Sequence, residues 1–301
     1  PSELTATSLQ SDIEYSLHPQ FNWNLSDLLK LTAPRDETLS LRLEVDGVIQ
    51  SERQLTISLR PLTEALYYVR DGQDAVDLSW IFAAYVNEND TIVDEILKEA
   101  RGYGITTNFN GYTSRDTKQV YRQVWAVWQA IETRGIRYSN ADPGISRGPN
   151  IFSQHVRFLA ETWTDRAANC VDGSVLIASV LQRLGIQPIL LLVPRHAFVG
   201  FYTDAEKRHL ALLETTLLGS TQIPHLQQRT DFAIGITPNA ANQQSLESYA
   251  AALAAGRARY SRIARKFDGR HRPDYVLIDI TKARAYGIMP IPQISGTVNH
   301  P

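Results

Sequence analysis

The sequence predicts an α+β fold, with a small β-sandwich-like domain at residues 1–88 followed by a larger mixed domain at residues 89–301. Early in the chain, apolar side chains alternate with polar ones, which is the period of a half-buried strand. Further along they recur every three or four residues, the period of an amphipathic helix. Three short apolar runs then follow a helix that begins at Cys170, and antiparallel strands are their simplest arrangement.

The first domain is predicted from an alternation that repeats on both sides of a turn. Leucine or valine occupies every second position in residues 39–45, and leucine or isoleucine does so in residues 55–59. Asp46-Gly47 directly follows the first run, and this dipeptide favours a tight β-hairpin turn. We therefore expect a hairpin-like unit within a small β-sandwich.

The second domain is predicted to open with two helices. Apolar residues have helical spacing in residues 92–97 and again in residues 120–131. Residues 140–150 are rich in Pro, Gly, Ser and Asn, which predicts an irregular loop beside a cleft. Trp125 and Trp128 fall on the apolar face of the second helix, so both are expected in the core.

A third helix is predicted from Cys170 to Leu184, because its apolar spacing is helical and Gly185 is well placed to end it. The apolar runs that follow it predict neighbouring antiparallel strands at 187–193, 197–202 and 210–216. A returning buried strand is expected at 275–280.

Residues 217–272 are more polar than their surroundings, and we interpret them as a helical insertion outside the core. An Ala/Arg-rich helix is expected near residues 245–266. Its arginines are interpreted as a solvated helix face rather than a phosphate site; they are Arg257, Arg259, Arg262 and Arg265.

Composition excludes several classes of function. The 30 Lys and Arg nearly balance the 32 Asp and Glu, so no global field draws the chain onto nucleic acid. No apolar run approaches the ~20 residues of a membrane span, which predicts a soluble protein without a membrane-spanning segment. The chain begins at Pro1, so a targeting segment could already have been removed, and the sequence leaves the cytoplasm and export open.

The chain contains one cysteine, Cys170, which excludes an internal disulfide and a cysteine-rich metal site. A lone cysteine is most often a small buried apolar side chain. Cys170, however, is placed at the amino end of a predicted helix, where the unpaired amides and the helix dipole favour a thiolate. A nearby imidazole would favour the thiolate further.

His196 and Glu214 are the candidate partners of this thiol. His196 begins the strand that follows the Cys170 helix and its first strand, so a helix and a reversal can return it to the helix tip. Glu214 is the charged residue within the next apolar run, and a buried carboxylate needs a partner. Either residue alone is as easily structural as functional; their joint arrangement with Cys170 favours a catalytic site.

Three motifs surround these residues: Asn169-Cys170-Val171-Asp172 at a helix start, Leu184-Gly185-Ile186 with Pro188 at its exit, and His196-Ala197-Phe198 on a strand. Together they resemble the transglutaminase-like superfamily, which has a papain-like core. The resemblance covers roughly residues 121–216, and it leaves the first ninety residues unexplained.

The resemblance implies that Cys170 attacks an acyl carbon, that His196 is general base and acid, and that Glu214 orients the imidazole. The family commonly has Asp in the third place, so Asp279 on the later strand is a rival to Glu214. Asp172 is expected to support the helix start.

The oxyanion of a tetrahedral intermediate would be bound by the backbone N–H of Cys170 and one more donor. Candidates for the second donor are Gln154, Trp163 and Asn169. Trp163 is, however, more readily placed in the core.

Three classes of function follow. The leading one is a cysteine peptidase or amidase that hydrolyses a protein or peptide amide, with the N-terminal domain as a recognition module and without a metal or other cofactor. The same acyl-enzyme could serve a transglutaminase or a deamidase. The alternatives outside catalysis are a peptide-binding module that retains the fold and holds a peptide in its cleft, and an interaction protein with an inert thiol. If residues 217–272 cover the cleft, we expect a zymogen-like or regulated enzyme instead.

Overall fold

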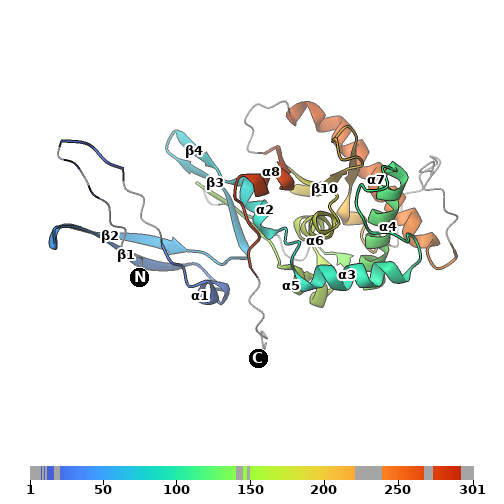
Figure 1. Cartoon of the computed structure of the whole chain (residues 1–301), viewed down its shortest axis with the longest axis horizontal. Helices are drawn as coiled ribbons and strands as arrows, with labels where there is room; N and C mark the ends of the chain where they lie inside the picture. Colours follow the sequence, from blue (N-terminus) through green and yellow to red (C-terminus); the bar gives the residue numbers. More distant parts are fainter. Residues whose placement is uncertain are drawn as a thin grey trace. The chain divides into compact units, whose positions relative to one another are not determined.

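A computed structural model of the chain describes residues 8, 10, 12–16, 21–139, 145–147, 150–220, 239–267 and 274–292 (Figure 1). The chain divides into two compact units, residues 1–64 with 300–301 and residues 65–299. Both units contain helix and strand, and the larger sheets are antiparallel. The predicted α+β class is therefore confirmed.

The smaller unit contains the predicted hairpin. Its described elements are α1 (Leu25–Leu29), β1 (Arg35–Val45) and β2 (Val48–Leu59). The two strands pair antiparallel up to Val45 opposite Val48. Asp46 and Gly47 form the two-residue turn with φ of 50° and 79°, the left-handed values that a type I′ hairpin turn requires.

The division into units differs from the predicted boundary at residue 88. The next strands, β3 (Glu64–Asp71) and β4 (Asp74–Asp77), join a four-stranded sheet of order β4-β3-β7-β6 with strands from far along the chain. In the described part of the smaller unit the strands form one two-stranded sheet, not the two packed sheets of a sandwich. An alternating pattern predicts that a segment is a strand, but it does not identify the partner strand. β3 pairs with β7, which lies about eighty residues later in the sequence.

The larger unit begins with short helices and a helical pair. It contains η1 (Ser79–Ile81), α2 (Phe82–Tyr85), α3 (Thr91–Gly102), α4 (Thr117–Thr133), β5 (Arg137–Tyr138), β6 (Ile145–Arg147), β7 (Ile151–His155), α5 (Leu159–Asp165) and β8 (Ala167–Ala168). The two predicted helices correspond to α3 and α4 and are confirmed. Of the predicted loop at 140–150, residues 145–147 form strand β6; residues 140–144 and 148–149 lie outside the described residues.

The second half of the larger unit contains the Cys-led helix and the main sheet. Its elements are α6 (Cys170–Arg183), β9 (Pro188–Val193), β10 (His196–Tyr202), β11 (Leu210–Leu213), η2 (Thr215–Leu217), α7 (Gln243–Ile263), η3 (Ala264–Phe267), β12 (Val276–Asp279) and α8 (Ile280–Ala285). The sheet has the order β11-β10-β9-β12. β9, β10 and β11 are antiparallel neighbours as predicted, and the returning strand β12 pairs antiparallel with β9. β11 ends at Leu213, so Glu214 lies just beyond the strand rather than within it.

The main sheet carries packed side chains on both faces. On one face, Val199 and Phe201 belong to the large core that includes α6, which Figure 1 shows at the centre of the unit beside α3 and β10. On the other face, Phe198 packs with Tyr260 and Ile263 of α7. The sheet therefore lies between α6 and the second half of α7.

Helix α7 is part of the core, so the prediction that residues 217–272 lie outside the core is wrong for this helix. The buried Trp125 and Trp128 of α4 donate through their indole Nε1 atoms to Ser245 Oγ at 3.0 Å and Ser248 Oγ at 2.8 Å. The polar composition of this segment suggested an exposed helix, but its small serines and alanines are what allow α7 to lie close to α4. Residues 221–238 and 268–273 of this segment lie outside the described residues.

None of the helices that the structure describes combines the length and the apolar character needed to cross a membrane.

Candidate functional site

The start of α6 is fixed by a reciprocal set of hydrogen bonds around Cys170. The side-chain Oδ1 of Asn169 accepts from the backbone N–H of Val171 at 2.8 Å and of Asp172 at 2.9 Å. Asp172 Oδ2 in turn accepts from the backbone N–H of Asn169 at 3.0 Å, which completes a capping box. The expected role of Asp172 at the helix start is therefore confirmed, and Cys170 is held half-buried as the first residue of α6.

Asp172 also ties the helix start to the segment before α5. Its fully buried carboxylate accepts from the backbone N–H of Arg157 at 2.9 Å and pairs with the Arg157 guanidinium at 3.0 Å. A buried carboxylate with three charge-assisted or backbone hydrogen bonds has little freedom to move. The position of Cys170 is thus set by contacts on both sides of the helix tip.

His196 and Glu214 are in direct contact. His196 Nε2 lies 2.9 Å from Glu214 Oε2, and their side chains are 11% and 4% exposed. The other carboxylate oxygen, Oε1, accepts from Thr216 Oγ1 at 3.0 Å and from the Thr216 backbone N–H at 3.3 Å. Glu214 thus caps η2 and turns one oxygen toward the imidazole.

The Cys170 thiol interacts with the same imidazole. Burial lowers the pKa of His196, but hydrogen bonds to Cys170 and Glu214, together with their negative charges, outweigh it and raise the pKa from 6.5 to about 9. Nε2 is the ring nitrogen that faces Glu214. With a pKa of about 9, the imidazole is protonated at neutral pH and lies near two acidic groups.

Glu214 is correspondingly ionised. Burial raises its pKa, but the hydrogen bond and charge of His196 and the charge of Arg259 outweigh burial, so the pKa of the carboxyl lies below its usual value of 4.5. Deep burial of an unpaired carboxylate would be costly, and here the two cations offset that cost.

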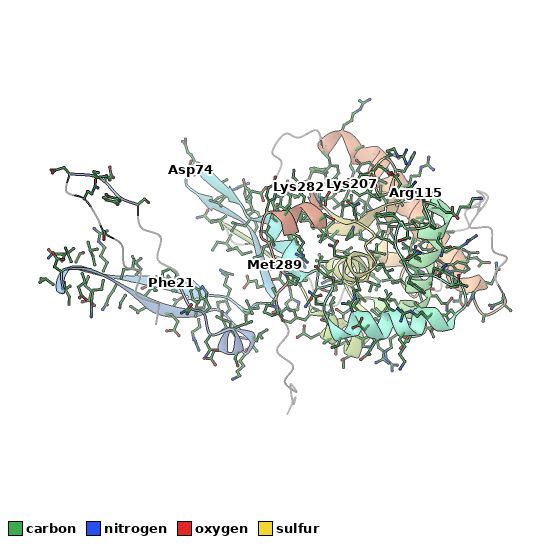
Figure 2. The ribbon with its side chains drawn as sticks, in the orientation of Figure 1. Phe21, Asp74, Arg115, Lys207, Lys282 and Met289 are labelled. Atoms are coloured by element: carbon green, nitrogen blue, oxygen red, sulfur yellow. The ribbon has the colours of Figure 1, made fainter. Side chains whose placement is uncertain are left out.

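The rival carboxylate, Asp279, is placed elsewhere. It caps α8 by accepting from Lys282 N at 3.0 Å, and it pairs with Lys207 Nζ at 2.6 Å. Figure 2 labels both lysines near the α8 end of the unit. Asp279 ends β12, at the opposite edge of the sheet from β11. Its partners and its place in the sheet give it no contact with His196.

The three oxyanion candidates differ in their existing partners. Trp163 Nε1 donates to Glu95 Oε2 at 3.0 Å, and its buried ring lies under the Arg134 guanidinium. Gln154 Nε2 donates to the backbone carbonyl of His155 at 2.9 Å. Asn169 uses only its oxygen for capping, and its buried Nδ2 has no hydrogen-bond partner in the described structure. Of the three candidates in the described structure, Asn169 is therefore the one whose donor nitrogen has no partner, whereas Gln154 Nε2 has committed one of its two N–H groups.

Sequence reasoning missed two residues close to this site. Arg259 Nε donates to Glu214 Oε2 at 2.9 Å, so this member of the arginine series binds a residue of the site, although its side chain remains partly exposed. Burial raises the pKa of the Tyr138 hydroxyl, and the charges of Cys170 and Glu214 raise it further, which places Tyr138 near both groups. Neither residue stands in a motif, so only the three-dimensional structure could identify them.

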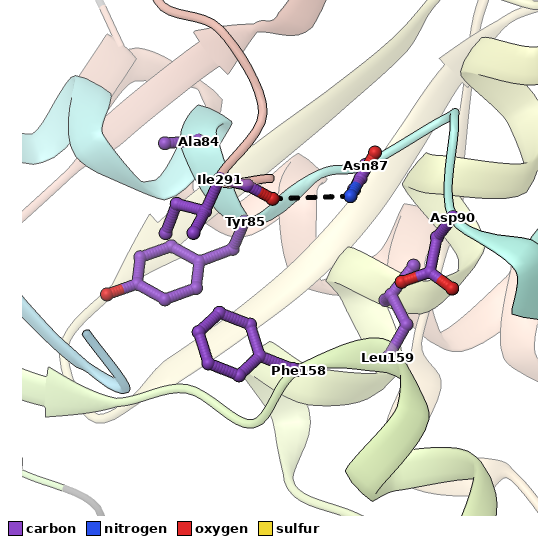
Figure 3. Close-up of a pocket in the computed structure, with 7 residues that line it drawn as sticks. All are labelled: Ala84, Tyr85, Asn87, Asp90, Phe158, Leu159 and Ile291. Carbon is purple, nitrogen blue, oxygen red and sulfur yellow. Dashed lines mark hydrogen bonds between the residues drawn. The ribbon is translucent and has the colours of Figure 1, made fainter. Parts of the chain in front are cut away.

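A separate small pocket lies beside α2 and α5 (Figure 3). It is bordered by the stacked rings of Tyr85 and Phe158, and Asn87 Nδ2 spans it with a hydrogen bond to the carbonyl of Ile291 at 3.3 Å. Its volume of ≈ 10 Å³ admits about one water molecule. The pocket is therefore too small to bind an organic substrate.

In the described ranges, no group of three His, Cys, Asp or Glu side chains is arranged to hold a metal ion.

Comparisons with known protein families, with curated proteins and with solved structures found no match to this chain.

Proposed function

We propose that the chain is a cysteine-dependent acyl-transfer enzyme. More particularly, we propose a peptidase or amidase that hydrolyses a protein or peptide amide through a thioester on Cys170. The observation that carries this proposal is the hydrogen bond of His196 to the Glu214 carboxylate at 2.9 Å, beside a Cys170 thiol that is near enough to raise the pKa of the imidazole. A nucleophile, a base within reach and a group that orients the base are the signature of covalent catalysis.

The proposed reaction begins with the proton on His196 and the negative charge on Cys170. The thiolate attacks the amide carbon, a C–S bond forms, and the carbonyl oxygen becomes an oxyanion. His196 gives its proton to the amide nitrogen as the C–N bond breaks, which releases the amine and leaves a thioester. Water then attacks the thioester while His196 takes its proton, and the acid leaves as the thiolate returns.

Three features of the site support these steps. The amino end of α6 favours the thiolate through its unpaired amides and dipole. Glu214 holds the imidazole by Nε2, which in the proposed mechanism leaves Nδ1 to carry the proton between the sulfur and the leaving group. The uncommitted Nδ2 of Asn169 is the side-chain donor nearest to Cys170 in sequence, and we assign it to the oxyanion together with the Cys170 backbone N–H.

The motif around Cys170, His196 and Glu214 also resembles the transglutaminase-like superfamily, which supports the same order of roles. We therefore propose membership of that superfamily and a protein or peptide as substrate. The resemblance does not decide whether the acyl group passes to water or to an amine.

The proposal is tested by the pH profile of Cys170 alkylation with iodoacetamide, followed by intact mass. Because the chain has one cysteine, each alkylation event reports on this thiol. We expect Cys170 to be alkylated faster than a free thiol at mildly acidic pH, because a paired imidazolium favours the reactive thiolate, and to lose this advantage in His196→Ala. His209→Ala is the matched control, since His209 is largely exposed and pairs only with Asp204 on a turn. An ordinary thiol that is indifferent to His196→Ala would contradict the proposal.

The acyl acceptor is identified by the products of a second experiment. The protein is incubated with a mixture of unmodified proteins and a labelled primary amine, with Cys170→Ala as the blank. New peptide termini support a hydrolase acting on the backbone, incorporated label supports a transglutaminase, and a mass gain of one unit at glutamine supports a deamidase. No product in any of these assays would favour the binding module over the enzyme.

A further inference from the structure

Two cations share one oxygen of Glu214. His196 Nε2 lies 2.9 Å from Glu214 Oε2, and Arg259 Nε donates to the same oxygen at 2.9 Å. Thr216 satisfies the other oxygen through its hydroxyl and backbone N–H. The carboxylate is thus fully engaged, and the charge that faces His196 is divided with Arg259.

Arg259 is brought there by the close approach of α7 to β11. The backbone N–H of Glu214 donates to the carbonyl of Ala252 at 3.0 Å. One turn further along α7, a Cβ on Gly256 would lie only 2.6 Å from the carbonyl oxygen of Leu212, so the two backbones are almost in contact there. Arg259 follows Gly256 by three residues and therefore lies on the same side of the helix, within reach of the carboxylate.

We propose that Arg259 is a further positioning residue of this site, which acts on His196 through the carboxylate oxygen that the two residues share. The proposal rests on the proposed function in so far as it gives His196 an acid–base role. Its test, however, reads the imidazole directly and does not depend on turnover.

The direction of the effect follows from the groups that face the imidazole. Cys170 faces it from α6 and Glu214 from the end of β11, and both favour the imidazolium. Tyr138 on β5 lies near both of these groups and is neutral at physiological pH, since its pKa is raised. Arg259 from α7 is the one cation bonded to Glu214 besides His196 in the described structure, and its charge opposes a second positive charge on the same oxygen.

Arg259 therefore makes His196 a stronger acid than the thiol and carboxylate alone would allow. A general acid is most effective when its pKa lies near the working pH, because it must give up its proton to the leaving group. Without Arg259 the imidazolium would hold its proton more tightly. Glu214 would remain in place, since Thr216 and the Ala252 carbonyl still hold it.

The test is an NMR pH titration of the histidine rings, with the His196 signal identified by its loss in His196→Gln. We expect Arg259→Gln to raise the pKa of His196 by about one, an effect moderated by solvent because the Arg259 side chain is 42% exposed. Arg259→Lys should leave the pKa near its original value. Arg262→Gln is the matched control, because Arg262 is exposed on the same helix and, among the described residues, bonds only the carbonyl of Ala258.

Arg259→Met retains the apolar stem and serves as a second neutral variant if Arg259→Gln does not fold. A merely structural role for Arg259 would loosen Glu214 and lower the pKa of His196, so an unchanged or lowered pKa in the folded variants would overturn the proposal. If Cys170 proves to be an ordinary thiol while the His196 pKa still rises, the proposed enzyme function fails and the role of Arg259 stands.

Discussion

Glu132, near the end of α4, leads to a specific prediction about the pH dependence of stability. Its Oε1 accepts from Ser248 Oγ of α7 at 2.7 Å and from the backbone N–H of Gly219 at 3.4 Å. Burial raises the pKa of Glu132 from 4.5 to about 7, and hydrogen bonds to Ser248, Gly219 and Trp128 offset only part of that rise. Glu132 is thus a carboxyl that folding prefers to keep protonated.

The sign of the effect follows from the two pKa values. Between pH 4.5 and about 7 the unfolded chain has lost the Glu132 proton, whereas the folded chain retains it. Raising the pH through this window therefore favours the unfolded state, and the stability present below pH 4.5 is lost as the pH passes 7. Each pKa unit of difference between the folded and unfolded states corresponds to about 1.4 kcal/mol, so the loss of folding stability amounts to about 3 kcal/mol.

The perturbation is Glu132→Gln, which keeps the accepting oxygen but cannot ionise. Urea unfolding, followed by tryptophan fluorescence, is measured for the parent and the variant from pH 4.5 to 8. We expect the free energy of unfolding of the variant to rise relative to that of the parent by about 3 kcal/mol between pH 4.5 and 8. Taking the difference between the two proteins cancels the titration of all other groups.

Glu206→Gln is the control, because Glu206 is exposed on the turn before β11 and its one ion pair within the described ranges is with the exposed Arg208. The free energy of unfolding of this control variant should differ from that of the parent by the same amount at every pH. If the difference between Glu132→Gln and the parent is likewise independent of pH, the reasoning from burial is refuted.

Two further predictions concern the contacts that position the site. Gly256→Ala should lower the free energy of unfolding by about 1 to 3 kcal/mol, because its Cβ would meet the Leu212 backbone. The control, Gly102→Ala at an open helical position, should not lower it. Equal unfolding temperatures for the two variants would contradict this prediction. Asp279→Asn should leave the pH profile of Cys170 alkylation unchanged, since Asp279 pairs with Lys207 rather than His196; a shift of that profile toward a free thiol would restore Asp279 as the orienting residue.

Local features of the fold could be predicted from the sequence. The Asp46-Gly47 turn, the helix from Cys170 and the order of the main strands each depend on residues that lie close together in the chain. Turn chemistry, capping and hydrophobic period are local properties, so a single sequence contains them. The contact of His196 with Glu214 could be predicted for the same reason, because consecutive antiparallel strands neighbour one another.

Features that depend on distant partners could not be predicted. β3 belongs to the larger unit because it pairs with β7, and α7 belongs to the core because Ser245 and Ser248 meet the indoles of α4. A serine that satisfies a buried tryptophan has no local pattern that separates it from a solvated serine. Arg259 was misassigned for the same reason: its partner, Glu214, lies 45 residues earlier in the chain.

The register of the main sheet favours glutamate over aspartate at position 214 for the role that we propose, which is to orient His196. The last pair of β10 and β11 is Val199 with Leu213. One further step would set Glu214 opposite Phe198, so that His196 becomes a diagonal neighbour at roughly 7–8 Å between main chains. Glutamate has one more methylene than aspartate, and the diagonal contact uses that length. The same reach brings Oε2 out to Arg259, so the longer side chain is what allows one carboxylate to bind both cations.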